Sequence, residues 1–458
     1  MSIQNAIDFE KRKNYELLNG RIVNYSNIDL KFFKKWEKFW KDDIGITQGD
    51  RIGLLIGENE LIMPVVLSLD NIICEIEFFN SGINRKNIEQ NIIKYNCIIS
   101  DQKLNYQEYR QIKEIELFKK KLFVYDFEKN TPLGGKRKSY IYYTSGSTGQ
   151  PKAFYKTENA VIKEGTAILN EINMCASDNI LCIAPCVHVF AQSIACVAAM
   201  LAGAKVEYMQ TIVSPNQIIK KIKKNNYDIL ITTPLYFEYL CGFKKEMEGI
   251  SKLITGGAKL SQKVIDSGLD IISFYGTTET GVISINKGQK QDNSVGRVVK
   301  GVEIVGEKTV SISKGKELKR IAVKSEFNSY AYREGPEKLV QLQGTIVLND
   351  YGYKKDEELF VMGRIDNIIN VNGLKVSSAE IEKELMKNEY IEKVSVIKQI
   401  KDSREYAKAY VVLKSDSHIE EEQLFEFCKK NIEHYKIPNK IEIVEELHYT
   451  ETGKILVN

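Results

Sequence analysis

Short apolar runs alternate with amphipathic segments through most of the chain. Residues 51–57 and 96–101 form strand-like runs, and the segment between them, 58–69, has a helical pattern. The same rhythm returns farther along, in strand-like and helical stretches at 181–186, 213–226, 227–234, 251–257 and 270–276. This alternation predicts layered α/β architecture with parallel sheets, in which ligands gather at the ends of the strands. We expect it to continue to about residue 370.

A smaller unit follows from about Asp366. Its pattern predicts, in order, a helix, two strands, a helix and a strand, at residues 377–388, 393–400, 407–415, 420–432 and 440–447. This is the composition of a small α+β domain. Because no Gly/Ser-rich linker or internal repeat precedes it, the join is short and can act as a hinge. We therefore predict two domains, residues 1–365 and 366–458.

Composition narrows the class of protein. Hydrophobic residues make up 43% of the chain and charged residues 28%, which allows a buried core. The 65 basic and 61 acidic residues are spread along the chain, so the formal charge of +4 does not indicate a nucleic-acid binder. The cysteines form no CxxC pair, and residues 1–13 contain no apolar signal segment. We expect no zinc site and a cytoplasmic location.

The longest apolar stretch runs from Val189 to Ala204. It is shorter than the roughly 20 residues that span a bilayer, and it contains Gln192 and Ser193. We predict a buried helix rather than a membrane span.

The strongest chemical signal is the string YYTSGSTGQPK at residues 142–152. Glycines let the backbone turn its N–H groups toward a triphosphate, and the Ser and Thr hydroxyls add donors. Its spacing differs from that of a Walker motif. The string therefore predicts a phosphate-binding loop of another kind.

A second string, FYGTTETG at residues 274–281, places Glu279 in a loop that follows a strand-like run. One carboxylate beside hydroxyl groups suits an Mg²⁺ ion shared with nucleotide phosphates. Taken alone, the string is equally typical of a helix N-cap with an acidic first turn.

Two more strings lie toward the C-terminus. GRIDNIINVNGLKVSSAEIE at residues 363–382 joins the two expected domains and contains Arg364, whose planar donors suit a ribose or a phosphate. A turn that feeds a capped helix also explains this string. In YTETGKILVN at residues 449–458, Lys454 follows a glycine in a polar turn.

In this order and at these separations, the four strings resemble the ANL superfamily of adenylate-forming enzymes, which includes acyl-CoA synthetases, adenylation domains of peptide synthetases and luciferases. The resemblance covers nearly the whole chain and is closest in pattern to the acyl-CoA synthetases of the AMP-binding family. ITGGAKL at 254–260 resembles the family's adenine-side loop, and LNDYGY at 348–353 holds Asp350 where the family keeps a ribose-binding aspartate. The resemblance implies a large ATP- and acid-binding N-terminal domain and a small mobile C-terminal lid.

The resemblance also implies roles for the matching residues. The catalytic residues would be Thr144, Glu279 and Lys454, and Mg²⁺ would be held by Glu279 and Thr148. ATP and AMP would contact Thr144, Ser145, Gly146, Ser147, Thr148, Gly149, Lys152, Gly256, Gly257, Ala258, Tyr275, Gly276, Thr277, Thr278, Asp350 and Arg364. The acid would lie beside His188, Phe190, Ala191, Gly257 and Gly281. Asp366 would be the hinge, and Gly373 and Lys375 would lie on the coenzyme A side.

The class of carboxylic acid that is activated can be narrowed further. Relatives that activate amino acids pair the amine with an aspartate at the position of Ala191, so an α-ammonium would lack its partner here. His188 resembles a histidine at the pocket mouth of acyl- and aryl-CoA ligases, and the apolar run after it suggests a roomy pocket, although a buried helix would read the same way. We expect a fatty acid first and an aryl acid second.

The acceptor is expected to be coenzyme A, with an acyl carrier protein as the alternative. A catalytically silent nucleotide-binding module is a further alternative, but Lys454 and Glu279 are both intact and argue against it.

Overall fold

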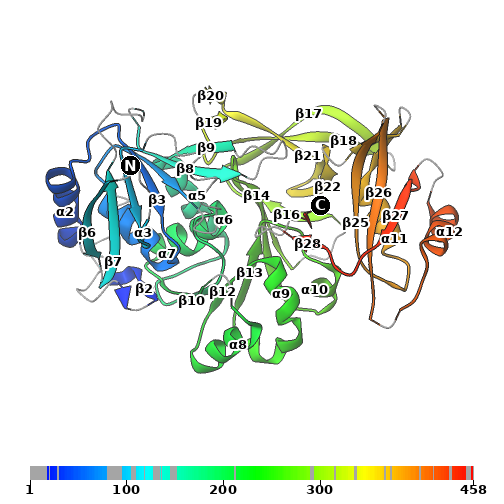
Figure 1. Cartoon of the computed structure of the whole chain (residues 1–458), viewed down its shortest axis with the longest axis horizontal. Helices are drawn as coiled ribbons and strands as arrows, with labels where there is room; N and C mark the ends of the chain where they lie inside the picture. Colours follow the sequence, from blue (N-terminus) through cyan, green and yellow to red (C-terminus); the bar gives the residue numbers. More distant parts are fainter. Residues whose placement is uncertain are drawn as a thin grey trace. The chain divides into compact units, whose positions relative to one another are not determined.

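The computed structural model describes residues 18–19, 21–27, 30–79, 95–104, 110–117, 119–126, 135, 137–144, 152–210, 213–288, 293–313, 316–334, 338–365, 368–371, 374–401, 404–415, 417–432, 436–449 and 455–456 (Figure 1). The chain divides into two units. The first holds residues 1–288, 298–303 and 324–346, and the second holds residues 289–297, 304–323 and 347–458. The predicted boundary at residue 366 stays a prediction.

A nine-stranded sheet carries the N-terminal part of the first unit. Its central strands β3, β4, β5 and β8 run parallel, whereas β9 is antiparallel to both β8 and β19. In spatial order the strands are β20 (Lys338–Gln341), β19 (Ala331–Glu334), β9 (Lys152–Thr157), β8 (Ser139–Thr144), β4 (Glu75–Phe78), β3 (Arg51–Leu55), β5 (Cys97–Ser100), β7 (Lys120–Asp126) and β6 (Arg110–Leu117). Strands 331–334 and 152–157 are therefore neighbours although they are far apart in sequence.

The other sheet of the first unit is parallel from β11 to β14 and then turns back in β15. Its order is β1 (Leu18–Asn19), β2 (Ile22–Asn24), β11 (Lys205–Tyr208), β10 (Asn179–Cys182), β12 (Ile229–Ile231), β13 (Lys252–Gly256), β14 (Ile271–Thr277) and β15 (Gly281–Lys287). The parallel strands predicted from the apolar runs are confirmed.

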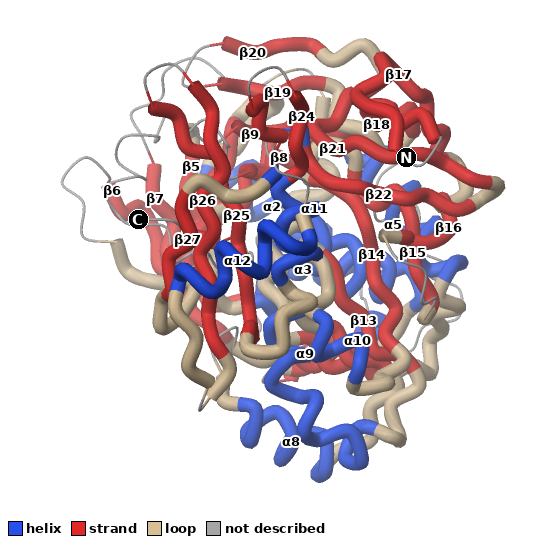
Figure 2. Tube along the Cα trace, turned by 90° about the vertical axis from the view of Figure 1, so that its right-hand side faces the viewer, coloured by secondary structure: helices blue, strands red, loops and turns tan. Residues whose placement is uncertain are grey.

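Helices cover these sheets. One apolar cluster joins Ile52 and Tyr140 of the nine-stranded sheet with Ile180 and Ile254 of the other. A second cluster packs Ile218 of α8 and Phe237 of α9 against β12 and β13, and these two helices lie on the same side of the strands (Figures 1 and 2). The helices are α2 (Leu30–Phe39), α3 (Asn59–Ser68), α5 (Glu158–Glu171), α8 (Pro215–Lys224), α9 (Pro234–Leu240) and α10 (Gln262–Asp266).

The apolar run that begins at Val189 forms the predicted buried helix. It consists of α6 (Val189–Ala191), a π-helical segment (Gln192–Ala198) and α7 (Ala199–Ala202), and every residue of the π-helical segment is buried. Among the helices that the structure describes, none has the length and apolar character to cross a bilayer.

The strands of the second unit are β16 (Ser294–Val298), β22 (Glu358–Arg364), β21 (Thr345–Lys355), β18 (Lys316–Ser325) and β17 (Val302–Ser313), in this spatial order. Between residues 281 and 364 the described residues contain strands and no helix, as Figure 2 shows in red. The expected alternation up to residue 370 is wrong for this stretch. In β21, Ile346, Leu348 and Asp350 are buried and alternate with half-buried residues, the period of two that marks a strand.

The C-terminal part of the second unit has the predicted α+β composition. β23 (Ile368–Val371) pairs with β24 (Leu374–Ser377), and β28 (His448–Tyr449) pairs with β29 (Ile455–Leu456). The helices α11 (Ser378–Leu385) and α12 (Glu421–Asn431) accompany a three-stranded sheet of β25 (Ile391–Lys401), β26 (Arg404–Leu413) and β27 (Lys440–Ile443). Ile381, Leu424 and Ile441 share one core cluster and are fully buried.

This core generates a stability prediction. Leu424→Ala removes three carbons from a side chain that is 0% exposed, so we expect the second unit to lose about 2 to 5 kcal/mol of unfolding free energy. Lys429→Ala on the exposed side of the same helix is the control and should change little. Urea denaturation followed by circular dichroism measures both, and equal midpoints would contradict the assigned core.

Candidate adenylation site

The phosphate-loop string lies on the hairpin of β8 and β9. Thr144, the last residue of β8, pairs with Lys152, the first residue of β9, so the two described ends of the string lie opposite each other. The predicted loop residues between them, Ser145, Gly146, Ser147, Thr148 and Gly149, lie outside the described residues. The Lys152 ammonium lies 5.2 Å from the centre of the Tyr332 ring, a cation–π contact with the neighbouring strand β19.

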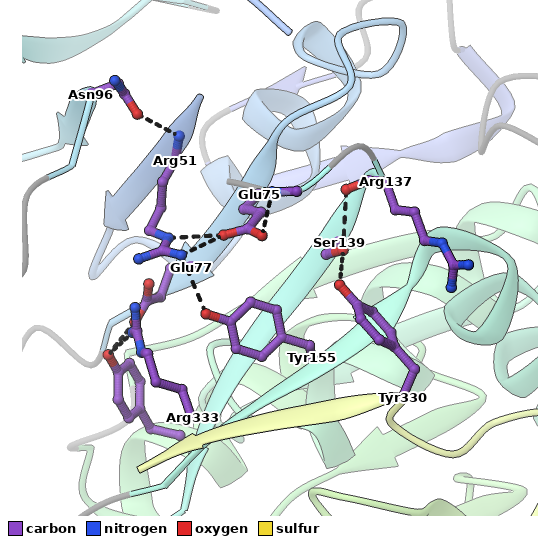
Figure 3. Close-up of polar contacts among 11 residues, drawn as sticks. Arg51, Glu75, Glu77, Asn96, Arg137, Ser139, Tyr155, Tyr330 and Arg333 are labelled. Atoms are coloured by element: carbon purple, nitrogen blue, oxygen red, sulfur yellow. Dashed lines mark hydrogen bonds and ion pairs between the residues drawn. The ribbon is translucent and has the colours of Figure 1, made fainter. Parts of the chain in front are cut away.

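Two buried charges hold one face of this hairpin. Tyr143 donates a hydrogen bond to Glu77, and Arg333 Nη2 donates to Glu77 Oε1 at 2.8 Å and to the Tyr143 hydroxyl at 3.1 Å. Glu77 is 0% exposed and Arg333 5%, and their contact, drawn in Figure 3, joins β4 and β19 across β8 and β9, the two strands of the hairpin. The residue just before the loop is thus tied to β4 and β19.

A second ion pair lies beside the first (Figure 3). Arg51 Nε and Nη2 both lie 2.8 Å from Glu75 Oε2, and Arg51 Nη2 also donates to the Tyr155 hydroxyl at 3.4 Å. The hydroxyls of Ser139 and Tyr330 are 2.8 Å apart. Polar contacts therefore cross the sheet from β3 to the segment that precedes β19.

The protonation states of this cluster follow from burial and charge. Burial raises the pKa of the Tyr143 phenol, and the Glu77 carboxylate raises it further, so the phenol stays a neutral donor. Burial disfavours the charged Arg333, but the negative Glu77 and the surrounding tyrosines raise its pKa above the usual range. A charged guanidinium therefore neutralises the buried Glu77 carboxylate.

Gln192 holds the opposite face of β8. Successive strand residues point to opposite faces, and Tyr142 donates its hydroxyl hydrogen to Gln192 Oε1. Gln192 Nε2 donates to the Cys186 carbonyl at 3.1 Å, and Asn59 Oδ1 accepts from the Cys186 amide at 2.9 Å. Gln192 is missing from the predicted site residues. The sequence feature that could have identified Gln192 is its polar amide within a largely apolar run. The sequence analysis used this feature only as an argument that the run does not span a membrane.

The string with Glu279 forms the hairpin turn between β14 and β15. Thr277 pairs with Gly281, and the hydroxyls of Thr277 and Thr280 are 3.0 Å apart. The alternative of a helix N-cap is wrong, because the residues that follow are strand β15. A Cβ on Gly276 would lie 2.2 Å from the Gly281 carbonyl oxygen, so the turn requires glycine there. Tyr275, Thr278 and Glu279 are half-buried around the turn.

The two hairpins are joined by two consecutive backbone amides. The Ser329 amide donates to the Glu279 carbonyl at 2.7 Å, and the Tyr330 amide donates to the Tyr155 carbonyl at 2.9 Å on β9. The turn that carries Glu279 and the hairpin that carries the phosphate string are therefore held side by side. The two strings to which the resemblance assigns phosphate and Mg²⁺ contacts are thus carried by neighbouring hairpins.

Of the predicted acid-side residues, Phe190 packs at the end of β13, and Gly257 directly follows this strand. The rings of Phe190 and Phe274 meet edge to face at 6.1 Å, and a Cβ on Gly256 would lie 2.6 Å from the Phe190 ring. Gly257 has a φ of +87° and is exposed together with Ala258. His188 directly precedes α6, and Ala191 is only 1% exposed. Phe190, Gly256 and Phe274 are thus brought together.

The second unit holds the remaining described residues of the predicted site. Asp350 of β21 and Arg364 of β22 are directly opposite each other, with Asp350 8% exposed and Arg364 exposed. Both ribose-side predictions therefore fall on one hairpin. Lys375 lies on β24, whereas Asp366, Gly373 and Lys454 lie outside the described residues.

Comparison with family models decides the class of protein. Residues 82–317 match the model described as "AMP-binding enzyme", and residues 380–454 match the model of its C-terminal domain. The chain belongs to the AMP-binding enzyme family. The predicted resemblance to the adenylate-forming ANL superfamily is confirmed, and with it ATP use and the enzyme class, an AMP-forming acid–thiol ligase.

Individual relatives are distant. The chain is 27% identical over 325 residues to a 3,4-dihydroxybenzoate–[aryl-carrier protein] ligase of Bacillus anthracis, covering 69% of this chain and 72% of the relative. It is 26% identical over 325 residues to a Staphylococcus aureus (strain COL) protein that carries the name of a long chain fatty acid–CoA ligase, covering 69% of each.

The fold is shared with solved structures. An o-succinylbenzoate–coenzyme A synthetase from Bacillus subtilis, in complex with ATP and a magnesium ion, has a TM-score of 0.70 at 18% identity, covering 92% of both chains. This confirms the predicted mixed α/β fold with a large body and a small C-terminal domain.

The buried cluster under the phosphate string generates a prediction. Arg333→Met leaves the Glu77 carboxylate buried without its cation, so we expect the free energy of unfolding to fall by about 3 to 5 kcal/mol. The control Lys121→Met breaks an ion pair whose lysine is 70% exposed and should leave stability unchanged. Guanidinium denaturation measures both, and similar small losses would show that the cluster does not stabilise the sheet.

Proposed function

We propose that this enzyme activates a fatty acid with ATP to acyl-AMP, with release of pyrophosphate, and then forms a thioester with coenzyme A. The observation that supports the proposal is the pairing of the two hairpins through Ser329 and Tyr330, which places the Glu279 turn beside the phosphate string. Both motifs of a nucleotide site are thereby fixed to one scaffold.

The first step needs positioning rather than a base. The acid is already ionised at neutral pH, so one carboxylate oxygen attacks the α-phosphorus while the bond to pyrophosphate breaks. The N–H groups of residues 145–150, with Lys152 and Lys454, would hold the phosphates and offset the developing charge. Asp350 and Arg364, paired across β21 and β22, would hold the ribose.

Magnesium fits the donor set on the phosphate side. Glu279 is a half-buried carboxylate in a turn with three threonines, and hard oxygen ligands of this kind suit Mg²⁺ together with nucleotide phosphates. Glu279 and Thr148 would hold the ion, which would neutralise phosphate charge when bound.

The second step, thioester formation, would require a rotation of the C-terminal domain. We propose a division into residues 1–365 and 366–458, with Asp366 as hinge, so that rotation withdraws Lys454 and brings Gly373 and Lys375 to the coenzyme A side. The separate family match at 380–454 supports an independent C-terminal domain. The thiolate sulfur then attacks the acyl carbon and AMP leaves. A cytoplasmic location stays part of the proposal.

The acid is proposed from the pocket residues. Ala191 offers no carboxylate to an α-ammonium, and the run from Val189 to Ala202, buried between residues 191 and 200, is apolar apart from Gln192 and Ser193. An aryl acid is the second candidate, favoured by the edge-to-face pair of Phe190 and Phe274 and by the aryl relative. The same relative makes a carrier protein the alternative acceptor.

An acid panel tests this proposal. Because Ala191 cannot pair an amine, we expect acid-dependent ATP–pyrophosphate exchange to be faster with fatty acids than with amino acids, with aryl acids as the comparison. Release of AMP with and without coenzyme A then identifies the acceptor. Exchange that is fastest with an amino acid would overturn the proposed substrate class.

Lys454 is tested by separating the half-reactions. Since this lysine would serve only the α-phosphate, Lys454→Ala should abolish acyl-AMP formation and leave thioester formation from supplied acyl-AMP largely intact. Lys429→Ala on α12 is the control and should retain both. A parallel loss of both half-reactions would show that the role assigned to Lys454 is wrong.

A further inference from the structure

A buried ion pair in the first unit has no role in the steps above. Lys156 Nζ lies 2.6 Å from Glu164 Oε2, and the two side chains are 1% and 2% exposed. Lys156 follows the phosphate string on β9, and Glu164 lies on α5, the helix that comes next. Removing both charges from water costs several kcal/mol per ion, and an apolar pair is often as stable. The pair therefore calls for a reason other than stability.

The second oxygen of Glu164 contacts the turn that carries Glu279. Glu164 Oε1 accepts a hydrogen bond from the Val282 amide at 3.0 Å, just beyond Gly281. A Cβ on Gly281 would lie 2.5 Å from the Glu164 carboxylate, and the φ of Gly281 is +72°. The turn thus approaches the carboxylate as closely as a residue without a side chain allows.

The same carboxylate lies near the strand that enters the phosphate string. Burial raises the pKa of Tyr142 on β8, and the negative charge of Glu164 raises it further. Glu164 thus pairs with Lys156 on the strand after the string and accepts a hydrogen bond from Val282 at the end of the Glu279 turn. Its charge also acts on Tyr142 of the strand before the string.

The helix that carries Glu164 is itself held in place. A Cβ on the next residue, Gly165, would lie 2.5 Å from Val197 Cγ1, so α5 packs closely on the π-helical segment. At its start, the Thr157 hydroxyl accepts from the Ala160 amide at 3.1 Å and caps the helix. A carboxylate on this helix has little freedom to follow a moving turn.

We propose that Glu164 and Lys156 are positioning residues that hold the Glu279 turn in register with β8 and β9, the strands on either side of the phosphate string. This inference rests on the proposed function, because it assigns the register to the binding of Mg²⁺ and ATP together. Both side chains are buried, so we assign them no direct contact with the nucleotide. Their loss should weaken the joint binding of metal and nucleotide and slow acyl-AMP formation, while thioester formation from supplied acyl-AMP should persist.

The test uses two matched double variants of the full chain. Lys156→Met with Glu164→Gln removes both charges at similar volume and leaves no buried ion unpaired. Arg51→Met with Glu75→Gln is the control, because it does the same to the buried ion pair between β3 and β4. Lys156→Met with Glu164→Leu, which also removes the acceptor oxygen of the Val282 amide, is the second test variant.

Two measurements are made on each variant. The Mg²⁺ concentration for half-maximal acyl-AMP formation should rise about 10- to 100-fold in Lys156→Met/Glu164→Gln and stay at the wild-type value in the control. The rise in Tm on adding ATP with Mg²⁺, relative to ATP with EDTA, should shrink in the test variants and not in the control. The second measurement does not depend on turnover.

The outcomes distinguish a failure of the positioning role from a failure of the proposed function. Wild-type Mg²⁺ dependence in every folded variant of Lys156 and Glu164 overturns the positioning role, as does an equal shift in the control. Absence of acyl-AMP formation by the wild-type chain with any acid overturns the proposed function instead. In that case the Mg²⁺- and ATP-dependent Tm shifts still decide whether the pair affects nucleotide binding.

Discussion

The first unit depends on buried charge on both faces of one short strand, β8. On one face, Tyr143 is tied to Glu77 and, through it, to Arg333 of a strand that is distant in sequence. On the other face, Tyr142 is tied to Gln192 and lies near Glu164. Because a buried charge without its partner costs far more than a lost apolar contact, neither face can slip without breaking an ion pair or a hydrogen bond. The strand register is therefore specified by electrostatics as well as by packing.

Such a constraint suits a protein that must bind a triphosphate with backbone groups. N–H donors stabilise a developing charge only if they already point at the right place, since reorganising them during the reaction would consume the gain. The described parts of the candidate site are likewise held in fixed positions. The Glu279 turn is fixed by the Ser329 amide and by close backbone approach at Gly276, and Phe190 packs where Gly256 has no side chain. The strands fix the positions of the turns to which the proposed function assigns the chemistry.

The sequence predicted the family, the parallel strands, the α+β unit and the buried helix, because each of these follows from local periodicity or from a contiguous motif. It did not predict the antiparallel strands between residues 281 and 364, where period-two burial is interrupted by charged residues. It also did not identify Gln192, Arg333 or Glu164. Their hydrogen-bond partners, Tyr142, Glu77 and Val282, are 50, 256 and 118 positions away in the sequence. Long-range pairing of this kind leaves no local pattern. The string at 274–281 was ambiguous alone, and only the pairing of β14 with β15 decides between turn and helix.

The π-helical segment Gln192–Ala198 has a consequence for how such an enzyme changes over evolutionary time. A π-helical turn arises when one residue is inserted into an α-helix, and its loss by deletion restores α-helical hydrogen bonding. One residue corresponds to a rotation of about 100° around the helix axis. A single-codon deletion here would turn Phe190 and Ala191 relative to Val197 and the residues after it, and so present a new set of side chains beside α5. On the proposed function, such a deletion would change the side chains beside the acid without altering the sequence of the strands that carry the nucleotide motifs.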